Sequence, residues 1–225
     1  MTYHNILSNY AQLSHIIDVS KGRSLLASHN ILLLAVTKQQ PIEKIKMLLG
    51  AGHRFYAENR VGDAEKKWID LKKTYPNVEL HLIGALQTNK VRPAIALFDV
   101  IETLDRMTLA DALEKEGAKQ NKIIRCMIQV NIGAESQKAG VSIAELHSLY
   151  IYTQKLPHLH VEGLMCIPPE NAPPAPYFSH MREFQQQLGL LHLSMGMSGD
   201  FETAIRFGAT HIRIGTALMG EREGG

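Results

Sequence analysis

The segment ILLLAVTKQQPIEKIKMLLGAG, residues 31–52, contains the pattern that decides the fold. The apolar run ILLLAV predicts a buried strand, and the residues after Pro41 place apolar side chains at helical spacing. Apolar runs of this kind recur along the chain, and a helical segment lies between each run and the next. We count eight of them, at residues 31–36, 53–58, 78–84, 99–104, 123–130, 160–167, 191–196 and 211–215.

Strands and helices that alternate along a chain form parallel sheets, because parallel neighbours need a crossover connection. Eight such units in about 200 residues predict an α/β protein with a closed (β/α)8 barrel of the TIM type. Residues from about Asn5 to Ser28 predict an extra N-terminal helix. The alternative is an open doubly wound sheet, which is less favoured because no GxGxxG motif follows the first strand.

We expect residues 1–225 to form a single domain, because no linker-like segment divides the chain. The one candidate boundary is the proline-rich segment PPENAPPAP, residues 168–176. It falls between a predicted strand and a predicted helix, so we interpret it as a long loop of the barrel.

The composition excludes several classes of function. The chain has 24 basic and 22 acidic residues, a formal net charge of +2, which gives no electrostatic basis for binding nucleic acid. No apolar run approaches the ~20 residues needed to cross a bilayer, and the first residues do not have the order of a signal peptide. We therefore expect a cytoplasmic protein with no membrane partner. Cys126 and Cys166 lie in apolar runs, without metal-ligand spacing, and are interpreted as buried hydrophobic residues.

The active sites of (β/α)8 barrels lie at the C-terminal ends of the strands, so we compared the residues that follow each predicted strand. The segments SMGMSGD (194–200) and RIGTALMG (213–220) are rich in glycine and small hydroxyl residues. Ser198 and Thr216 supply hydroxyl groups, and the helix starts that follow favour anions. Glycine and serine also make the tight turns that such loops need. The presence of both loops in adjacent units favours a phosphate site.

Lys38 stands directly after the first predicted strand. Most lysines at such positions are solvated loop residues. The alternative is an amine inside the barrel mouth, where burial and nearby positive charge lower its pKa below the usual value of ~10.4. A neutral amine can form a Schiff base with an aldehyde. Because strands eight and one are neighbours in a closed barrel, the ligand would carry a phosphate and a carbonyl, as pyridoxal 5′-phosphate (PLP) or a small sugar phosphate does.

Arg213 lies inside the eighth predicted strand, two residues before Gly215, so both residues face the same side. An arginine directed inward needs an acceptor. A carboxylate is one candidate and a pyridine nitrogen is another. Because arginine does not give up its proton, it would hold a pyridine nitrogen unprotonated and weaken the ring as an electron sink.

Seven segments carry a resemblance to a known family: AVTK (35–38), AENRV (57–61), HLIGALQTNK (81–90), QVNIGAESQKAGV (129–141), EGLMCIPP (162–169), LSMGMSGDFETAI (193–205) and RIGTALMG (213–220). With these segments the chain resembles the pyridoxal phosphate homeostasis proteins, relatives of the N-terminal barrel of alanine racemase. The resemblance implies a monomeric barrel with PLP on Lys38. The other residues that it implies at the cofactor are Arg213 at the pyridine nitrogen, Asn59 near the ring, and Ser198, Gly199, Gly215 and Thr216 at the phosphate.

The function implied by the resemblance is the carriage or buffering of PLP in the cell, with PLP-dependent apoenzymes as recipients and no committed reaction. An amino-acid racemase and a Schiff-base aldolase acting on sugar phosphates are the alternatives. A racemase is best served by an acid/base group on each face of the ring. In alanine racemases the second group is a tyrosine from a β-rich domain of the partner subunit. This chain ends with GEREGG soon after the eighth strand, so we expect a cofactor-binding protein and no racemase.

Overall fold

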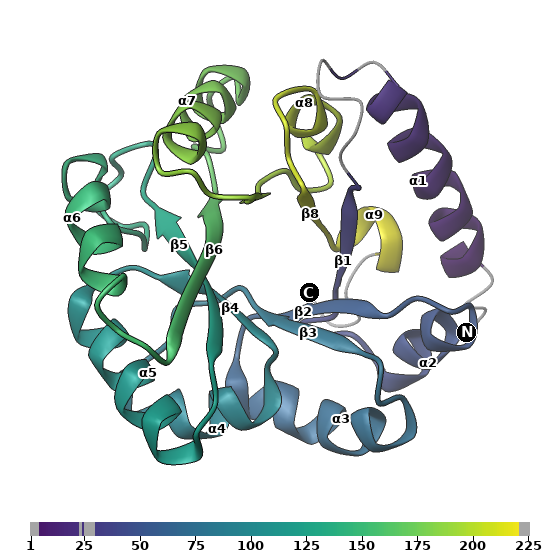
Figure 1. The fold of residues 1–225 in the computed structure, drawn as a ribbon. Helices are drawn as coiled ribbons and strands as arrows, with labels where there is room; N and C mark the ends of the chain where they lie inside the picture. The colour runs from purple at the N-terminus through teal and green to yellow at the C-terminus, as the bar shows by residue number, and fades with distance from the viewer. Residues whose placement is uncertain (1–4, 23, 25–29, 221–225) are drawn as a thin grey trace.

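The computed structural model describes residues 5–22, 24 and 30–220. In these residues, eight parallel strands pair in chain order, and β1 also pairs with β8, which closes the barrel (Figure 1). Each predicted apolar run overlaps one strand, so the predicted (β/α)8 barrel is confirmed. The strands are β1 (Leu32–Val36), β2 (Phe55–Glu58), β3 (Glu79–Leu82), β4 (Val100–Leu104), β5 (Ile124–Val130), β6 (Leu159–Cys166), β7 (His192–Ser194) and β8 (His211–Ile214).

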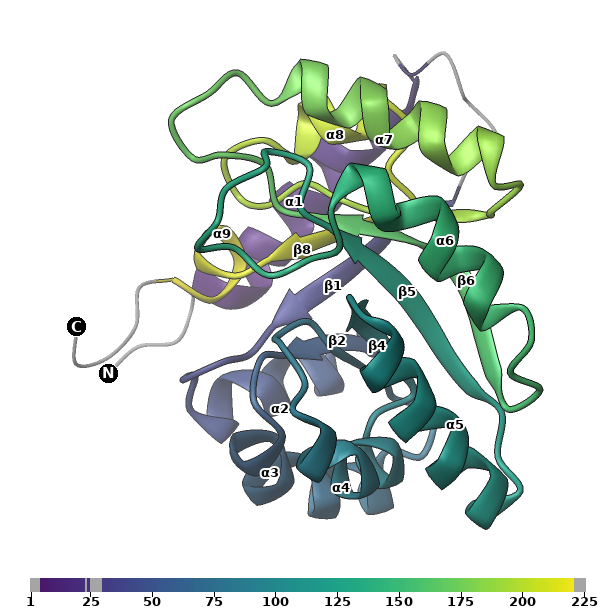
Figure 2. The same ribbon diagram turned by 90° about the vertical axis from the view of Figure 1, so that its left-hand side faces the viewer.

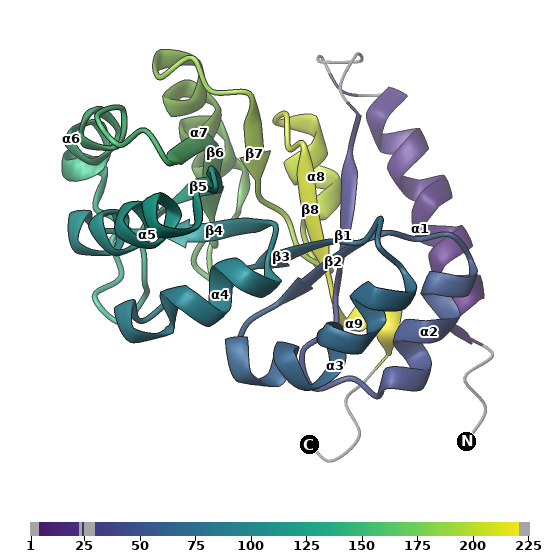
Figure 3. The ribbon, with the colours of Figure 1, turned by 60° about the horizontal axis from the view of Figure 1, so that its bottom comes forward.

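The helices surround the ring of strands on its outside (Figures 1 and 3). They are α1 (Asn5–Gly22), α2 (Ile42–Gly50), α3 (Val61–Thr74), the 3-10 turn η1 (Thr88–Lys90), α4 (Val91–Leu97), α5 (Met107–Gln120), α6 (Ile143–Thr153), α7 (Ala175–Gln187), α8 (Phe201–Arg206) and α9 (Thr216–Met219). The predicted N-terminal helix is confirmed as α1, which contacts α2, α8 and α9. It ends at Gly22, and residues 23 and 25–28 of its predicted span lie outside the described residues.

Local sequence signals set several helix starts. Ser142 caps α6 by accepting a hydrogen bond from the Glu145 backbone N–H at 3.3 Å, and its own hydroxyl donates to the Glu145 side chain at 2.6 Å. As predicted, the proline-rich segment forms the loop between β6 and α7, and the helix begins at its end, at Ala175 after the N-cap residue Pro174. No helix in the described part of the chain is long and apolar enough to span a membrane.

The interior of the barrel has an apolar side next to β1 and β2. Leu34, Val36 and Ala57 are buried there in one cluster, against which Leu32, Phe55 and Ile83 pack. Side chains of this kind fill the interior of most (β/α)8 barrels. The opposite side, formed by β3 to β8, contains charged, imidazole and hydroxyl side chains.

A chain of hydrogen bonds crosses this polar side. We call it the interior polar chain, and its members in order of contact are Arg213, Ser194, Glu102, His81, Glu79, Arg125 and Glu162. The distances between successive donor and acceptor atoms range from 2.6 Å for Ser194 Oγ to Glu102 Oε2 up to 3.1 Å for Arg125 Nη1 to Glu79 Oε2. The chain thus runs from the C-terminal end of β8 to the N-terminal halves of β5 and β6.

His81 is the central cation of this chain, and its side chain is fully buried. Burial alone would lower the pKa of His81, but its hydrogen bonds to Glu102 and Glu79 outweigh burial and raise that pKa to about 9. Burial alone would raise the pKa of Glu102, but the hydrogen bond from His81 and the positive charges of His81 and Arg213 together outweigh burial and lower that pKa to about 2. The interior polar chain therefore contains three cations, which are Arg213, Arg125 and protonated His81, and they balance its three carboxylates.

This charge balance predicts that alkaline pH destabilises the fold. The pKa of His81 is higher in the folded protein than its ordinary value of 6.5. Its contribution to the free energy of unfolding is therefore complete below pH 6.5 and is lost as pH rises through 9. The carboxylate contribution is complete above pH 4.5 and is lost only as pH falls toward 2. We expect the free energy of unfolding, measured with urea, to fall by an amount on the order of 3 kcal/mol between pH 6.5 and 9.

NMR titration of the His81 ring in the folded protein provides the control, because it follows one group. A midpoint near pH 9 is expected. A midpoint at or below the ordinary value of 6.5, together with a stability that does not change over this range, would contradict the charge assignment.

Candidate functional site

Lys38 lies in a tight turn directly after β1, with its side chain partly exposed. The turn closes through the Gln40 backbone N–H, which donates to the Thr37 carbonyl at 3.1 Å. Between them Gln39 has a φ of 57°, a left-handed conformation that is uncommon for a residue other than glycine. The buried strand therefore ends abruptly and places Lys38 at the C-terminal end of the barrel, as predicted.

A buried carboxylate holds the residue before Lys38. Glu58, at the end of β2, is fully buried and accepts a hydrogen bond from the Thr37 hydroxyl at 2.7 Å. Lys67 of α3 forms an ion pair with the same carboxylate at 2.5 Å and donates to the Thr37 carbonyl at 2.7 Å. The Trp68 indole N–H adds a contact of 3.3 Å. These contacts fix the end of β1 against β2 and α3.

A buried lysine holds the other side of the Lys38 turn. Lys44, on α2, donates to the Gln40 side chain at 3.0 Å and to the Met219 carbonyl at 2.9 Å. Met219 is the last residue of α9, the short helix that begins at Thr216. Lys44 therefore ties the turn that carries Lys38 to the helix that follows the second predicted phosphate loop.

The two predicted phosphate loops meet in space. The Ser198 hydroxyl accepts a hydrogen bond from the Ala217 backbone N–H at 3.3 Å, which brings the loop after β7 to the start of α9. Gly199 and Thr216 are exposed on these loops, and Gly215 is partly exposed. The four residues that the sequence assigned to phosphate therefore lie in one region, which contains hydroxyl groups and backbone N–H groups.

This region adjoins the end of β1. A Cβ atom at Gly215 would lie 3.7 Å from the Cβ of Val36, two residues before Lys38. The pairing of β8 with β1, which places Arg213 opposite Leu34, gives the same neighbourhood. The predicted adjacency of strands eight and one is confirmed.

Arg213 points into the barrel, as its position in β8 predicted, and is 3% exposed. Its Nη1 donates to the Ser194 hydroxyl at 2.8 Å and its Nη2 donates to the Cys166 carbonyl at 2.8 Å. The partners of Arg213 inside the protein are thus a serine and a backbone carbonyl, while the Glu102 carboxylate lies one hydrogen bond further along the interior polar chain. A guanidinium has five N–H groups, so donors remain for an acceptor on a ligand.

Asn59 follows β2 at the same end of the barrel and is partly exposed. Its backbone lies very close to Gly84, where an added Cβ would stand 2.0 Å from the Asn59 carbonyl oxygen. Only glycine fits at position 84, and the close approach fixes the end of β2 against the end of β3.

The loops after β5 and β6 lie together on this side of the molecule. Lys138 of the first loop donates to the Pro168 carbonyl of the second at 3.0 Å. A Cβ atom at Gly133 would lie 2.5 Å from the Pro169 ring, so the two loops are in direct contact there. Figure 2 shows both loops projecting on the same side of the barrel as α9.

Sequence reasoning gave no role to four buried polar residues near the predicted site: Glu58, Lys44, Ser194 and Glu102. Two of them left a signal. Glu102 interrupts the apolar run DVIETL, and Ser194 lies within the segment LSMG. Buried polar side chains need partners, so a polar residue inside a predicted strand of a closed barrel indicates a second one across the interior.

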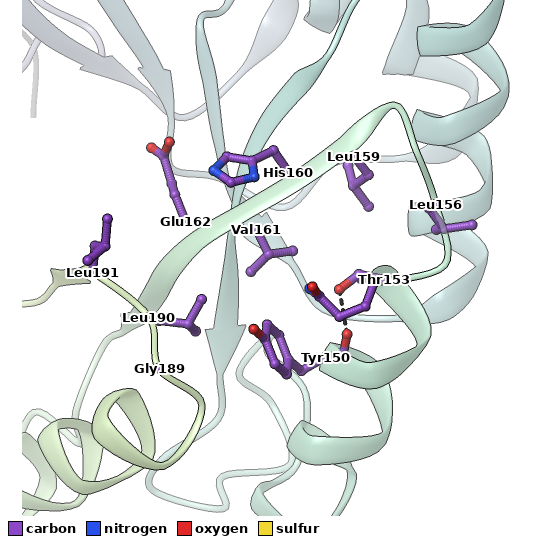
Figure 4. A pocket seen from close by; sticks show the side chains of 11 residues that line it. Tyr150, Thr153, Leu156, Leu159, His160, Val161, Glu162, Gly189, Leu190 and Leu191 are labelled. Carbon is purple, nitrogen blue, oxygen red and sulfur yellow. Dashed lines mark hydrogen bonds between the residues drawn. The ribbon is translucent and has the colours of Figure 1, made fainter.

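A cavity of about 280 Å³ lies at the opposite end of β6, between α6 and the connection from α7 to β7 (Figure 4). Its wall contains Tyr150, His160 and Leu190, together with Glu162 from the end of the interior polar chain. Both Glu162 oxygens accept hydrogen bonds from Arg125, at 2.9 and 3.1 Å. None of the residues that the sequence assigned to the cofactor lines this cavity.

Comparison with known proteins identifies the family to which the chain is similar. The family described as the N-terminal domain of alanine racemase matches residues 17–223. The pyridoxal phosphate homeostasis protein of Aquifex aeolicus (strain VF5) is 44% identical over 200 residues, which cover 85% of this chain and 87% of the relative. The protein of that name from Vibrio cholerae serotype O1 is 36% identical over 230 residues and 97% of both chains.

Solved structures show the same fold. PipY of Synechococcus elongatus PCC7942, with PLP bound, has a TM-score of 0.77 at 32% identity, covering 91% of this chain and all of that one. The alanine racemase of Corynebacterium glutamicum has a TM-score of 0.69 at 17% identity, a likeness of fold alone that covers 94% of this chain and 60% of the racemase. By its identity to these relatives over most of their length and its match over residues 17–223, this chain belongs to the pyridoxal phosphate homeostasis proteins, within the alanine racemase N-terminal domain family.

Proposed function

We propose that the protein binds PLP at the C-terminal end of the barrel and holds it as a Schiff base on Lys38, as an intracellular carrier or buffer with no committed reaction. The observation that carries the proposal is the convergence of three elements at this end of the barrel. They are the Lys38 turn, the buried Arg213 guanidinium, and the two loops that meet at Ser198 and Ala217. The name of the relatives and the PLP-bound PipY structure support it.

The residues present fit the chemistry of PLP. An amine suits its aldehyde, and a guanidinium donor suits its ring nitrogen. Hydroxyl groups and exposed glycines in two adjoining loops suit its phosphate. When bound, PLP supplies an aldehyde that forms Schiff bases with amines. Asn59 is proposed to lie near the ring, and PLP-dependent apoenzymes are the proposed recipients.

The charge at the ring nitrogen supports the proposed lack of a committed reaction. Arg213 keeps its proton, so in this proposal it donates to the nitrogen and leaves it unprotonated. An unprotonated ring withdraws electrons weakly, which disfavours reactions at the α-carbon of an amino acid. We propose in addition that the protein acts as a monomeric barrel of residues 1–225 that releases its cofactor to other proteins.

The first prediction concerns Lys38. Protein loaded with PLP should absorb near ~420 nm, as protonated Schiff bases of PLP do, and Lys38→Ala should remove the band because it removes the amine. Borohydride reduction followed by peptide mass analysis should locate the label on Lys38. Lys46→Ala, which removes an exposed lysine of the neighbouring helix α2, is the matched control and should keep the band. A band of full strength in Lys38→Ala would rule out the assignment.

The second prediction concerns the phosphate. Each hydroxyl contributes a hydrogen bond to the anion, so Ser198→Ala combined with Thr216→Ala should weaken PLP binding by roughly 10- to 100-fold in an absorbance titration. Pyridoxal, which lacks the phosphate, is the control ligand, and its weaker binding should be the same in both proteins. Equal loss of affinity for both ligands, or no loss for PLP, would place the phosphate elsewhere.

The third prediction concerns the absence of a committed reaction. Exchange of the α-hydrogen of L-alanine in D2O, followed by NMR, should be no faster with the PLP-loaded protein than with Lys38→Ala. The same samples, analysed for D-alanine, should show no racemisation. Exchange that is rapid and depends on Lys38 would favour the racemase alternative over the carrier role.

A further inference from the structure

The Arg213 end of the interior polar chain has a defined direction. Arginine can only donate and a carboxylate can only accept, whereas the Ser194 hydroxyl has a single proton. Ser194 therefore accepts from Arg213 at 2.8 Å and donates to Glu102 at 2.6 Å, and no other arrangement satisfies all three groups. All three residues are at most 3% exposed, so water does not compete for these bonds.

The Glu102 carboxylate cannot turn away from Ser194. Its second oxygen is held by His81 at 2.6 Å, and the other nitrogen of that imidazole is held by Glu79 at 2.9 Å. Both oxygens of Glu102 are thus occupied by partners from β3 and β7. Each side chain of the interior polar chain from Glu79 to Ser194 is therefore held by its neighbours. The Ser194 hydroxyl is the one acceptor that they hold in a fixed position for Arg213.

Two strands fix the plane of the guanidinium. Nη1 is bound by Ser194 of β7 and Nη2 by the Cys166 carbonyl of β6. A planar group held at two of its three nitrogens has its remaining N–H directions determined before any ligand arrives. Such preorganisation reduces the entropy lost when a ligand acceptor is bound.

We propose that Ser194 and Glu102 are positioning residues for PLP: acting through the Ser194 hydroxyl, Glu102 fixes Arg213 in the orientation in which it donates to the ring nitrogen of the cofactor. The inference rests on the proposed function. It assigns a role in ligand discrimination to two residues of the barrel core that do not themselves contact the ligand. Glu79 and His81 belong to the same interior polar chain. Glu79 binds the imidazole nitrogen that faces away from Glu102, so it makes no direct hydrogen bond with Glu102, Ser194 or Arg213.

The test compares PLP with its 1-deaza analogue, in which carbon replaces the ring nitrogen. The unmodified protein should bind PLP about tenfold more tightly than the analogue, since only PLP accepts the hydrogen bond from Arg213. In Ser194→Ala and Glu102→Gln this preference should fall to within about twofold. The readout is a ratio of two affinities in one protein, so a general loss of stability does not change it.

Glu79→Gln is the matched control. It makes the same change from carboxylate to amide, in the same chain and against the same imidazole, yet it leaves the contacts from Glu102 through Ser194 to Arg213 in place. It should lower stability, as Glu102→Gln does, and keep the tenfold preference. If Glu102→Gln does not fold, Ser194→Ala, which removes a single oxygen atom, carries the test.

The possible failures are distinct. If the unmodified protein binds neither ligand, or its absorbance band does not depend on Lys38, the proposed function itself fails. If it binds both ligands equally, or if Ser194→Ala keeps the tenfold preference, PLP binding stands and the positioning role is overturned. Loss of the preference in Glu79→Gln as well would show that the effect is not specific to the Glu102 side of the chain and would also overturn the proposal.

Discussion

The ion pair between His81 and Glu102 is the constraint on which the polar side of the barrel depends. Both side chains are fully buried, where an unpaired charge costs several kcal/mol. Neither can be removed alone, because the remaining group would keep its burial and lose its partner. Each of the two also binds a second member of the interior polar chain: His81 binds Glu79, and Glu102 binds Ser194. These neighbours therefore also need their hydrogen-bond partners in place. The fold tolerates these charges because they balance as a set.

This arrangement makes the core and the candidate site parts of one structure. Arg213 ends the interior polar chain and also stands at the end of the barrel where the Lys38 turn lies. An apolar interior would stabilise a barrel at least as well, since buried ion pairs often add little net stability. The polar chain supplies something that an apolar interior does not, namely a guanidinium with a fixed plane and a balanced charge. The role proposed for Ser194 and Glu102 gives the barrel a reason to retain the buried charges of Glu102 and Arg213.

The sequence was sufficient for the features that depend on order along the chain. Eight alternating runs predicted the barrel, and barrel closure placed Lys38 beside the loops after the seventh and eighth strands. The contacts inside the barrel depend on the register in which neighbouring strands pair. The order of the segments along the sequence does not determine that register. Between β5 and β6 the register shifts after Cys126, so that Glu162 has no partner across the ladder and reaches Arg125 instead. A slip of one residue in this register would turn the side chains to the other face of the strand.

Lys38 itself shows how local and distant contacts combine. The turn that carries it includes a left-handed residue, Gln39, and so costs free energy in isolation. Contacts on either side offset that cost: Glu58 holds Thr37, and Lys44 joins Gln40 to the end of α9. None of these contacts restrains the amine directly; they fix the backbone from which it extends. A rigid backbone with a partly exposed side chain suits a group that must be reached by its ligand, form a bond at a defined place, and give the ligand up again.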